Sequence, residues 1–344
     1  MALFYIIQQL SSLLILLKYR KLYALVSLFF FVIIFLFKPD TFDLVMYPDI
    51  VLSVARHEIL FEKVINFISL FINDERKVIT VYQIFLLCVA SLMLLFFQES
   101  KDKLLILAII LSSVAVMMSV HNNLRQGLAS IIILISIFSY LAGYKKTAII
   151  LLISSQGFHR SSIFFITIIF FASIIFSNLY KRFSSFNNLE CMKMVYVLAF
   201  GISSILFIAI ISSMSYLDYL TLGKTEFKNY VRDFEYGQFR TPVMIKNFIL
   251  LLFIIATEFF LKFKSINYRL DLLRFLRISF VLTCLFLSII DDFSEVSNRI
   301  LFMYYTIEMG MLCILVSEKF YNTTIVILFG YAFAFNIWNI VGGI

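Results

Sequence analysis

The sequence predicts an all-α fold, a polytopic integral membrane bundle of about 11–12 transmembrane helices. Hydrophobic residues make up 62% of the 344-residue chain and charged residues 15%, whereas soluble domains average roughly 45–50% apolar and about 25% charged residues. Apolar runs long enough to cross a bilayer recur from end to end, with short basic segments between them. Three prolines and ten glycines leave no flexible linker. Residues 1–344 are therefore expected to form a single transmembrane domain.

The expected spans follow from the length of the apolar runs. A span needs roughly 17–25 mostly apolar residues, with slack for tilt. Runs of this kind fall at about 2–17, 22–37, 78–97, 104–120, 127–143, 147–157, 161–178, 194–215, 244–262, 274–290, 300–317 and 323–341. The run 147–157 is short, and we interpret it as a half-helix that leads into a turn at His159.

The distribution of cations predicts which side each loop faces. The positive-inside rule assigns to the cytoplasm the segments 18–21, 98–103, 144–146, 180–193, 262–277 and 318–322. These segments hold 16 of the 29 lysines and arginines. The topology therefore explains the net charge of +8 without a nucleic-acid partner. The same alternation places 38–77 and 216–243 outside, as the two long outer loops.

One outer segment carries a helical pattern of its own. In the first outer loop, apolar residues recur near helical spacing at Leu60, Phe61, Val64, Ile65, Phe67, Ile68 and Phe71. This pattern predicts an amphipathic helix over about 59–72 that lies at the membrane interface.

Arginine is over-represented on the side where cations are expected to be few. Seven of the twelve arginines lie in the outer segments: Arg56, Arg76, Arg125, Arg160, Arg232, Arg240 and Arg299. Guanidinium groups bind phosphate oxygens through bidentate, geometrically fixed hydrogen bonds. We interpret Arg125, Arg160 and Arg299 as candidate phosphate ligands. Pairing with nearby acids is the alternative, and it is favoured for Arg56 and Arg76.

A first burst of polar residues, His121-Asn122-Asn123-Leu124-Arg125-Gln126-Gly127-Leu128-Ala129, separates two apolar runs, and its candidates are His121, Asn122, Arg125 and Gln126. Polar groups at membrane depth are costly unless they are paired or wetted, so they are functional candidates. His121 and Arg125 are four residues apart and would share one helix face if 121–129 is helical. Asn122 and Gln126 add neutral donors. The alternative is a helix cap with an interfacial Arg125 that snorkels to lipid phosphate.

A second burst, Gln156-Gly157-Phe158-His159-Arg160-Ser161-Ser162, interrupts the next two apolar runs. Because the preceding run is short, His159 and Arg160 are expected below the membrane surface in a wetted cavity. Neighbouring arginines are expected to disfavour the imidazolium form, which leaves a neutral ring that can accept a proton. A structural histidine is the alternative interpretation.

Acidic and aromatic residues complete the set of candidates. Asp291, Glu295 and Arg299 are spaced four residues apart and could line one helix face; a solvated acidic turn is the alternative. The first outer loop offers as candidates Asp43, Tyr47, Asp49, Glu58 and Glu62. We favour Asp291 and Glu62 as catalytic acids or bases, and Asp43 and Tyr47 as substrate contacts. Loop 216–243 holds seven aromatic residues, and among them Tyr236 is the candidate for substrate binding.

Several function classes lack their sequence signals. The chain has no G-x-x-x-x-G-K-[ST], G-x-G-x-x-G, G-x-S-x-G or H-E-x-x-H motif, so nucleotide use and zinc hydrolysis are unsupported. The four cysteines show no C-x-x-C pair and give no sign of a metal site. We expect neither a metal nor a cofactor.

Two motifs carry a resemblance to a known family. Asn123-Leu124-Arg125-Gln126-Gly127-Leu128-Ala129 is followed, one helix later, by Gly157-Phe158-His159-Arg160-Ser161-Ser162. This pair resembles the Arg-Gln-x-x-Ala and Phe-His-x-Ser elements of EpsG-type, Wzy-like polymerases of bacterial surface polysaccharides. The acids of the first loop, and Arg299 with Tyr304, resemble looser family patterns.

The resemblance implies a metal-independent glycosyltransferase, an O-antigen polymerase of the bacterial inner membrane with its site facing the periplasm. Donor and acceptor would be undecaprenyl-pyrophosphate-linked glycans, and a chain-length regulator protein is a candidate partner. Arg125, Arg160 and Arg299 would stabilise the leaving pyrophosphate. His159, Asp291 or Glu62 would act on the acceptor hydroxyl, and aromatic residues such as Tyr236 would pack on sugar faces. An O-antigen ligase and a lipid-linked oligosaccharide flippase are the main alternatives, with an acyltransferase third.

Overall fold

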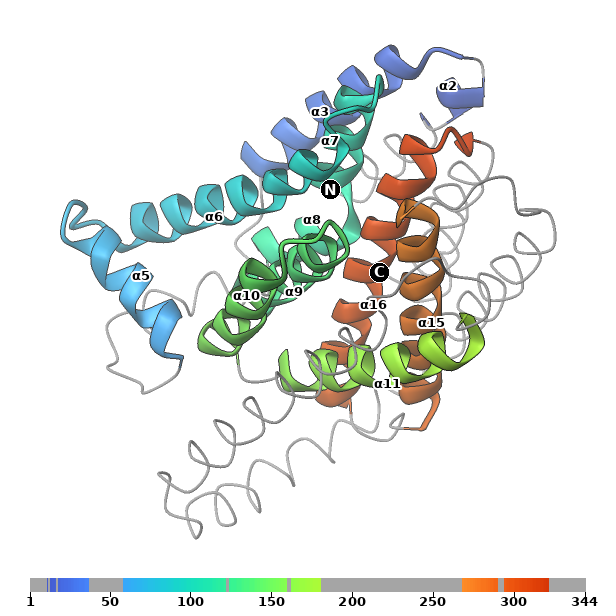
Figure 1. Cartoon of the computed structure of the whole chain (residues 1–344). Helices are drawn as coiled ribbons and strands as arrows, with labels where there is room; N and C mark the ends of the chain where they lie inside the picture. Colours follow the sequence, from blue (N-terminus) through green and yellow to red (C-terminus); the bar gives the residue numbers. More distant parts are fainter. Residues whose placement is uncertain are drawn as a thin grey trace, which may run out of the picture.

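A computed structural model of the chain is shown in Figure 1. It describes residues 11, 13–16, 18–36, 58–121, 124–159, 162–180, 268–289 and 294–321. Within these ranges the chain is helical and contains no strand. The all-α prediction is therefore confirmed for this part of the chain.

The described helices follow the apolar runs closely. They are α2 (Leu13–Leu16), α3 (Arg20–Leu36), α5 (Ile59–Ser69), α6 (Glu75–Ser91), the 3-10 helix η1 (Leu92–Phe97), α7 (Lys103–Ser112), α8 (Val114–His121), α9 (Leu124–Leu141), α10 (Lys145–Phe158), α11 (Ser162–Tyr180), α15 (Tyr268–Ile289) and α16 (Ser294–Ser317). The predicted spans 194–215, 244–262 and 323–341, most of 2–17, and the outer loop 216–243 lie outside the described residues.

Two described stretches are long and apolar enough to cross a membrane: Glu75–Phe97, which joins α6 to η1, and α9. A third arises if α7 and α8 count as one span, although their axes are bent by 50°. These two or three spans do not confirm the predicted number of about 11–12. The apolar helices fit a membrane protein.

The break between α7 and α8 corrects the prediction of one continuous span over 104–120. Ser113 takes an extended backbone conformation, with φ −64° and ψ 148°. Its Oγ donates to the carbonyl of Ile110 at 2.8 Å and accepts from the N–H of Val116 at 3.2 Å. One serine side chain therefore satisfies backbone groups on both sides of the break, which apolar periodicity alone does not reveal.

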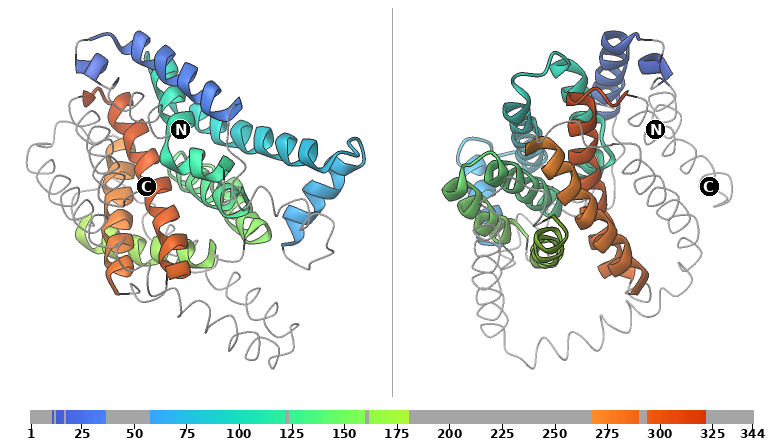
Figure 2. Two further views of the ribbon diagram at one scale, coloured as in Figure 1. Left: turned by 180° about the vertical axis from the view of Figure 1, so that it is seen from behind. Right: turned by 45° about the vertical axis from the view of Figure 1, so that its right-hand side comes forward.

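The core is organised around α9. Nearly every residue from Leu124 to Tyr140 is buried, and α9 contacts α6, α8, α10, α11 and α16 (Figures 1 and 2). A helix that is apolar on all sides is stable only when neighbours surround it. Any side chain in the first turn of α9 is therefore held by the best-packed element of the described bundle.

The α10 helix returns antiparallel to α9, after a turn in which Gly143 has a φ of 94°. It contains 14 residues, a length of about 21 Å at 1.5 Å per residue. The hydrocarbon core of a bilayer is roughly 30 Å thick. The prediction of a half-helix that ends at a His159 turn is confirmed, because α10 ends at Phe158 and His159 is extended.

The predicted helix near 59–72 is present as α5, which lies at one edge of the bundle in Figure 1. One face buries Phe61, Ile65 and Ile68, and the ring centroid of Phe61 lies 5.3 Å from that of Tyr82 on α6. The other face exposes Phe67 and other apolar side chains. Its location at the membrane interface stays a prediction.

Candidate active site

One buried carboxylate brings the two polar bursts together. Glu58 Oε2 accepts a hydrogen bond from Arg125 Nη1 at 2.7 Å, and Glu58 Oε1 lies 2.9 Å from His159 Nδ1. The side chains are 6% exposed at Glu58, 21% at Arg125 and 12% at His159. We call these three residues the Glu58 cluster. Arg125 lies 67 positions and His159 lies 101 positions after Glu58 in the chain, and both contact this one carboxylate.

The start of α5 places Glu58 in the cluster. Glu58 has an extended backbone, with φ −119° and ψ 125°, and its side chain does not cap the helix. Its carbonyl still accepts from the N–H of Glu62 at 3.0 Å. Phe61, one turn along α5, lies under the Arg125 guanidinium, with 5.5 Å from Cζ to the ring centroid. Arg125 is therefore held by the carboxylate just before α5 and by a ring in the first turn of that helix.

Glycine allows α5 to reach the end of α10. A Cβ added at Gly157 would lie 2.5 Å from Leu60 Cγ and 2.7 Å from Leu60 Cδ1. Gly127 plays the same part between α8 and α9, since its Cβ would lie 2.9 Å from the backbone Cα of Ser119. Both glycines belong to the two motifs that flank the candidate residues.

The second motif closes a hydrogen-bonded turn around His159. The His159 N–H donates to the carbonyl of Ser155 at 3.1 Å, and the His159 carbonyl accepts from Ser162 Oγ at 2.7 Å. Gln156 Nε2 in turn donates to Ser162 Oγ at 2.6 Å. Ser155, four residues before His159, and Ser162, three residues after it, therefore fix its backbone, and Glu58 fixes its ring.

The electrostatics of the cluster are set by Glu58, which lies just before α5. Burial raises the pKa of its carboxyl, but the hydrogen bond from His159 and the charge of Arg125 outweigh burial and lower the pKa to about 2. Glu58 is therefore ionised at neutral pH. The expectation that cations would disfavour the imidazolium considered only arginines; the structure adds a carboxylate 2.9 Å from Nδ1, which favours a proton on that nitrogen.

The other predicted site residues have different positions. His121 ends α8 whereas Arg125 lies in α9, so the two do not share a single helix face. Gln126 is buried in α9, and Glu62 lies one turn along α5 from Glu58 and is partly exposed. Arg299 lies in α16, with its side chain outside the description. Also outside the described residues are Asp43, Tyr47, Asn122, Arg160, Tyr236 and Asp291.

Glu58 is one of several acids in the first outer loop, and nothing in the local sequence distinguishes it from Glu62 as a site residue. The contact that selects Glu58 spans 67 residues, and no local spacing reports it. One signal was present in the sequence: Glu58 directly precedes the predicted amphipathic helix.

The model of the EpsG family matches residues 21–342, nearly the whole chain. The chain belongs to the EpsG family. The resemblance inferred from the two motifs is thus confirmed, and EpsG-family proteins are Wzy-like polymerases. Membership indicates a membrane polysaccharide polymerase, an enzyme of glycosyltransferase type. No curated protein and no solved structure matches the chain.

Proposed function

We propose that this EpsG-family protein joins undecaprenyl-pyrophosphate-linked oligosaccharide repeat units into a surface polysaccharide, on the periplasmic face of the inner membrane. The observation that carries the proposal is the Glu58 carboxylate, which bonds Arg125 and a histidine ring at once. An arginine suited to phosphate and a histidine suited to proton transfer are what this reaction needs side by side.

The reaction can be written with these residues. The oxygen of an acceptor hydroxyl attacks the anomeric carbon of the donor sugar, and the bond from that carbon to the pyrophosphate oxygen breaks. The hydroxyl proton passes to His159. With Nδ1–H donated to Glu58, the lone pair of the neutral ring lies on Nε2, so Nε2 is the nitrogen that accepts the proton. Glu58 then stabilises the imidazolium that forms, as a buried carboxylate does in other histidine dyads.

Arg125 stabilises the other product of the reaction, the pyrophosphate that carries the leaving charge. The Glu58 bond uses Arg125 Nη1, and a guanidinium has further N–H donors in the same plane. We propose Arg160, Arg299 and His121 as further ligands of the pyrophosphate, and Asn122 and Gln126 as neutral donors. Asp43, Tyr47 and Tyr236 would contact sugars, while Asp291 and Glu62 remain alternative acids for the acceptor hydroxyl.

Substitution of Glu58 tests the proposal directly. In a strain that lacks this gene, Glu58→Gln should leave mainly single-repeat product on a gel of surface polysaccharide, with a normal amount of protein in the membrane. Glu75→Gln at the start of α6 is the matched control, and it should restore long chains. Long chains from Glu58→Gln would remove the Glu58 cluster from the reaction.

The same strain separates the alternative functions. Deletion of a polymerase leaves one repeat unit on each acceptor, whereas deletion of a ligase or flippase leaves none. A deletion strain with no repeat unit at all would therefore reject the polymerase assignment, whatever the Glu58 variants show.

A further inference from the structure

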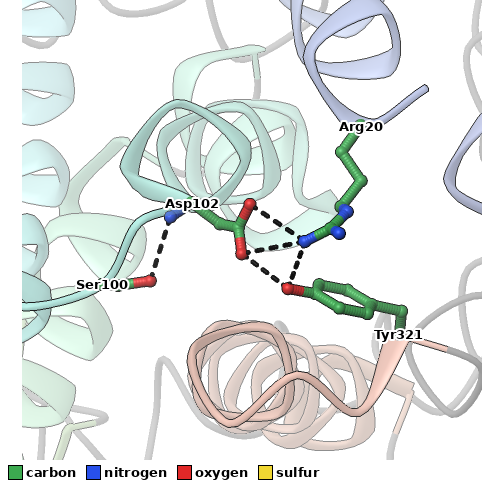
Figure 3. Close-up of polar contacts among 4 residues, drawn as sticks. All are labelled: Arg20, Ser100, Asp102 and Tyr321. Atoms are coloured by element: carbon green, nitrogen blue, oxygen red, sulfur yellow. Dashed lines mark hydrogen bonds and ion pairs between the residues drawn. The ribbon is translucent and has the colours of Figure 1, made fainter. Parts of the chain in front are cut away.

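A second polar cluster joins three helix ends that are far apart in sequence (Figure 3). Arg20 Nη1 lies 3.3 Å and 3.2 Å from the two carboxylate oxygens of Asp102, and Tyr321 Oη donates to Asp102 Oδ2 at 2.6 Å. Arg20 also donates to Tyr321 Oη, and its Cζ lies 4.1 Å from the centroid of the tyrosine ring. We call Arg20, Asp102 and Tyr321 the Asp102 cluster. It ties the start of α3 to the start of α7 and the end of α16.

This cluster lies at the other end of α9 from the Glu58 cluster. Phe97, five residues before Asp102, packs its ring 5.7 Å from that of Phe138 near the C-terminal end of α9. Arg125 lies in the first turn of α9, about 20 Å away along the helix at 1.5 Å per residue. All three joined segments are among those that the cation distribution predicts to be cytoplasmic.

Exposed lysines surround the Asp102 cluster. The three segments 18–21, 98–103 and 318–321 carry six cations against the acids Glu99, Asp102 and Glu318. Asp102 is already bonded to Arg20 and Tyr321. Five lysines are exposed, and we call them the basic junction: Lys18, Lys21, Lys101, Lys103 and Lys319. The hydrogen bonds of the Asp102 cluster bring these charges from three parts of the chain to one place.

Two of these lysines have left-handed backbone conformations, which glycine adopts more easily than other residues. Lys18 and Lys319 each have a φ of 66°. Each lysine lies just after a helix, and the residue after the lysine donates its N–H to a carbonyl five positions earlier. Tyr19 N–H donates to Leu14 O, and Phe320 N–H donates to Leu315 O. Gly143 occupies the same position after α9, with Tyr144 N–H bonded to Ser139 O.

Glycine is the usual residue in this helix ending because an L side chain disfavours left-handed backbone. The chain uses glycine after α9 and lysine after α2 and α16. Left-handed backbone at residues other than glycine costs free energy, and such residues occur preferentially at functional positions. The comparison indicates that Lys18 and Lys319 are present for their charge, since local structure alone would favour glycine.

The surface beside the basic junction is apolar. Tyr19 is exposed just before α3, Leu22 and Leu25 are exposed on α3, and Leu104 is exposed at the start of α7. Lysine stems lie along apolar surface while their ammonium groups reach the headgroup layer. A basic rim that borders exposed apolar helices fits the surface of a bilayer, whereas an acidic protein partner would require no apolar border.

We propose that the basic junction binds the headgroups of anionic phospholipids and so holds α3, α7 and α16 together at the end of the bundle away from the Glu58 cluster. Clustered lysines attract anionic headgroups electrostatically, and the attraction falls with ionic strength. A lipid that binds the folded state and not the unfolded state stabilises the folded state, and this stabilisation rises with the logarithm of the ratio of lipid concentration to Kd. The proposal concerns stability and does not rest on the proposed polymerase activity.

The test measures the unfolding temperature of the purified full-length protein in nanodiscs. Discs with phosphatidylglycerol should raise it by several degrees over discs of phosphatidylcholine alone. In the double variant Lys18→Gly/Lys319→Gly the gain should fall by at least half, although glycine relieves the backbone at both positions. Lys18→Arg/Lys319→Arg keeps the charges and should keep the gain.

Controls separate the basic junction from net charge and from soluble anions. Lys146→Gln on α10 and Lys77→Gln on α6 remove exposed lysines elsewhere and should keep the full gain. A soluble glycerol phosphate added to phosphatidylcholine discs should produce no gain. An undiminished gain in the double glycine variant would overturn the proposal. An equal loss of the gain in unfolding temperature in the Lys146 and Lys77 variants would also overturn it, as would a full gain in unfolding temperature from the soluble anion.

Discussion

The Glu58 cluster and the Asp102 cluster have the same arrangement of side-chain types but differ in burial and in the chemistry of the ring. Each has a carboxylate that bonds an arginine and a ring from other helices. Glu58 is 6% exposed and holds a histidine, whereas Asp102 is 19% exposed and holds a tyrosine. Burial, with the hydrogen bond and charge of Asp102, raises the pKa of Tyr321 to about 12, so the phenol keeps its proton at neutral pH. The Asp102 cluster therefore only joins helix ends, while the Glu58 cluster contains the histidine that the proposed mechanism uses as a base.

The backbone around the two clusters supports the same distinction. Beside Glu58, Gly157 stands where a Cβ would press on Leu60. Beside Asp102, Lys18 and Lys319 stand where glycine would be easier. Close approach is the requirement at the first cluster, and exposed positive charge is the requirement at the second.

Loss of the histidine should have the largest effect. His159→Ala removes both hydrogen bonding and basicity, and a general base contributes about 10²- to 10⁴-fold to a rate. It should leave single-repeat product at a normal protein level. Tyr321→Phe makes the corresponding change in the Asp102 cluster and should leave polymer length unchanged, as seen on the same gel.

His159→Gln distinguishes the roles of the ring. If basicity matters, this variant should also leave single repeats; if only positioning matters, it should retain long chains. Reduced protein abundance in both His159 variants, with normal polymerisation by the protein that survives, would make His159 structural and erase the contrast between the clusters.

Arg125→Lys should lose most polymerisation, by roughly tenfold or more. Lysine keeps the charge beside Glu58 but cannot hold the carboxylate and two phosphate oxygens in one plane. Gel analysis of polysaccharide, together with immunoblotting of membranes, provides the measurement. Full-length polysaccharide from this variant would reduce Arg125 to an anchor that snorkels to lipid.

Gly157→Ala should weaken the site through packing alone. The new methyl group would press on Leu60, and overpacking of this kind costs about 1–3 kcal/mol. Polymerisation should fall while α10 itself stays intact. Leu60→Ala in the same chain removes the obstructing atoms and should restore much of the activity. Failure of that rescue would show that the approach of α5 to α10 is not what Gly157 provides.

The last effect concerns the pH dependence of stability and leaves polymerisation aside. The depressed Glu58 pKa of about 2, against 4.5 for the free side chain, contributes stability that is present above about pH 4.5 and is lost as pH falls toward 2. The contribution is on the order of 3 kcal/mol. The unfolding temperature of the wild type should therefore exceed that of Glu58→Gln between pH 5 and 8, and the difference should shrink as pH falls from 4.5 to 3. A difference that stays constant over that range would contradict a charged Glu58.

Much of the fold could be predicted, because the length of an apolar run reports a helix directly. The helices α3, α6, α9 and α16 fall close to their runs, and the short run before His159 predicted the turn correctly. The break at Ser113 could not be predicted, since it depends on a side chain that bonds two backbone groups.

Prediction of the site was limited by distance along the chain. Arg125 and His159 stood out because charge is rare in apolar surroundings. Glu58 lies in a loop where several acids occur, and only the tertiary contact to α9 and α10 distinguishes it. The close approach of Gly157 to Leu60 could not be predicted either, because a glycine in a sequence does not indicate which side chain packs against it.

The most direct test of the central claim is a double-mutant cycle between Glu58 and His159, with the polymerisation rate of purified protein on lipid-linked repeat units as the measurement. If Glu58 acts by orienting His159, Glu58→Gln should lower the rate by tenfold or more in the wild type. It should cost little in a chain that already carries His159→Gln, because residues that act as a unit are not additive. Equal costs in both backgrounds would show that Glu58 and His159 act independently, and would contradict the account.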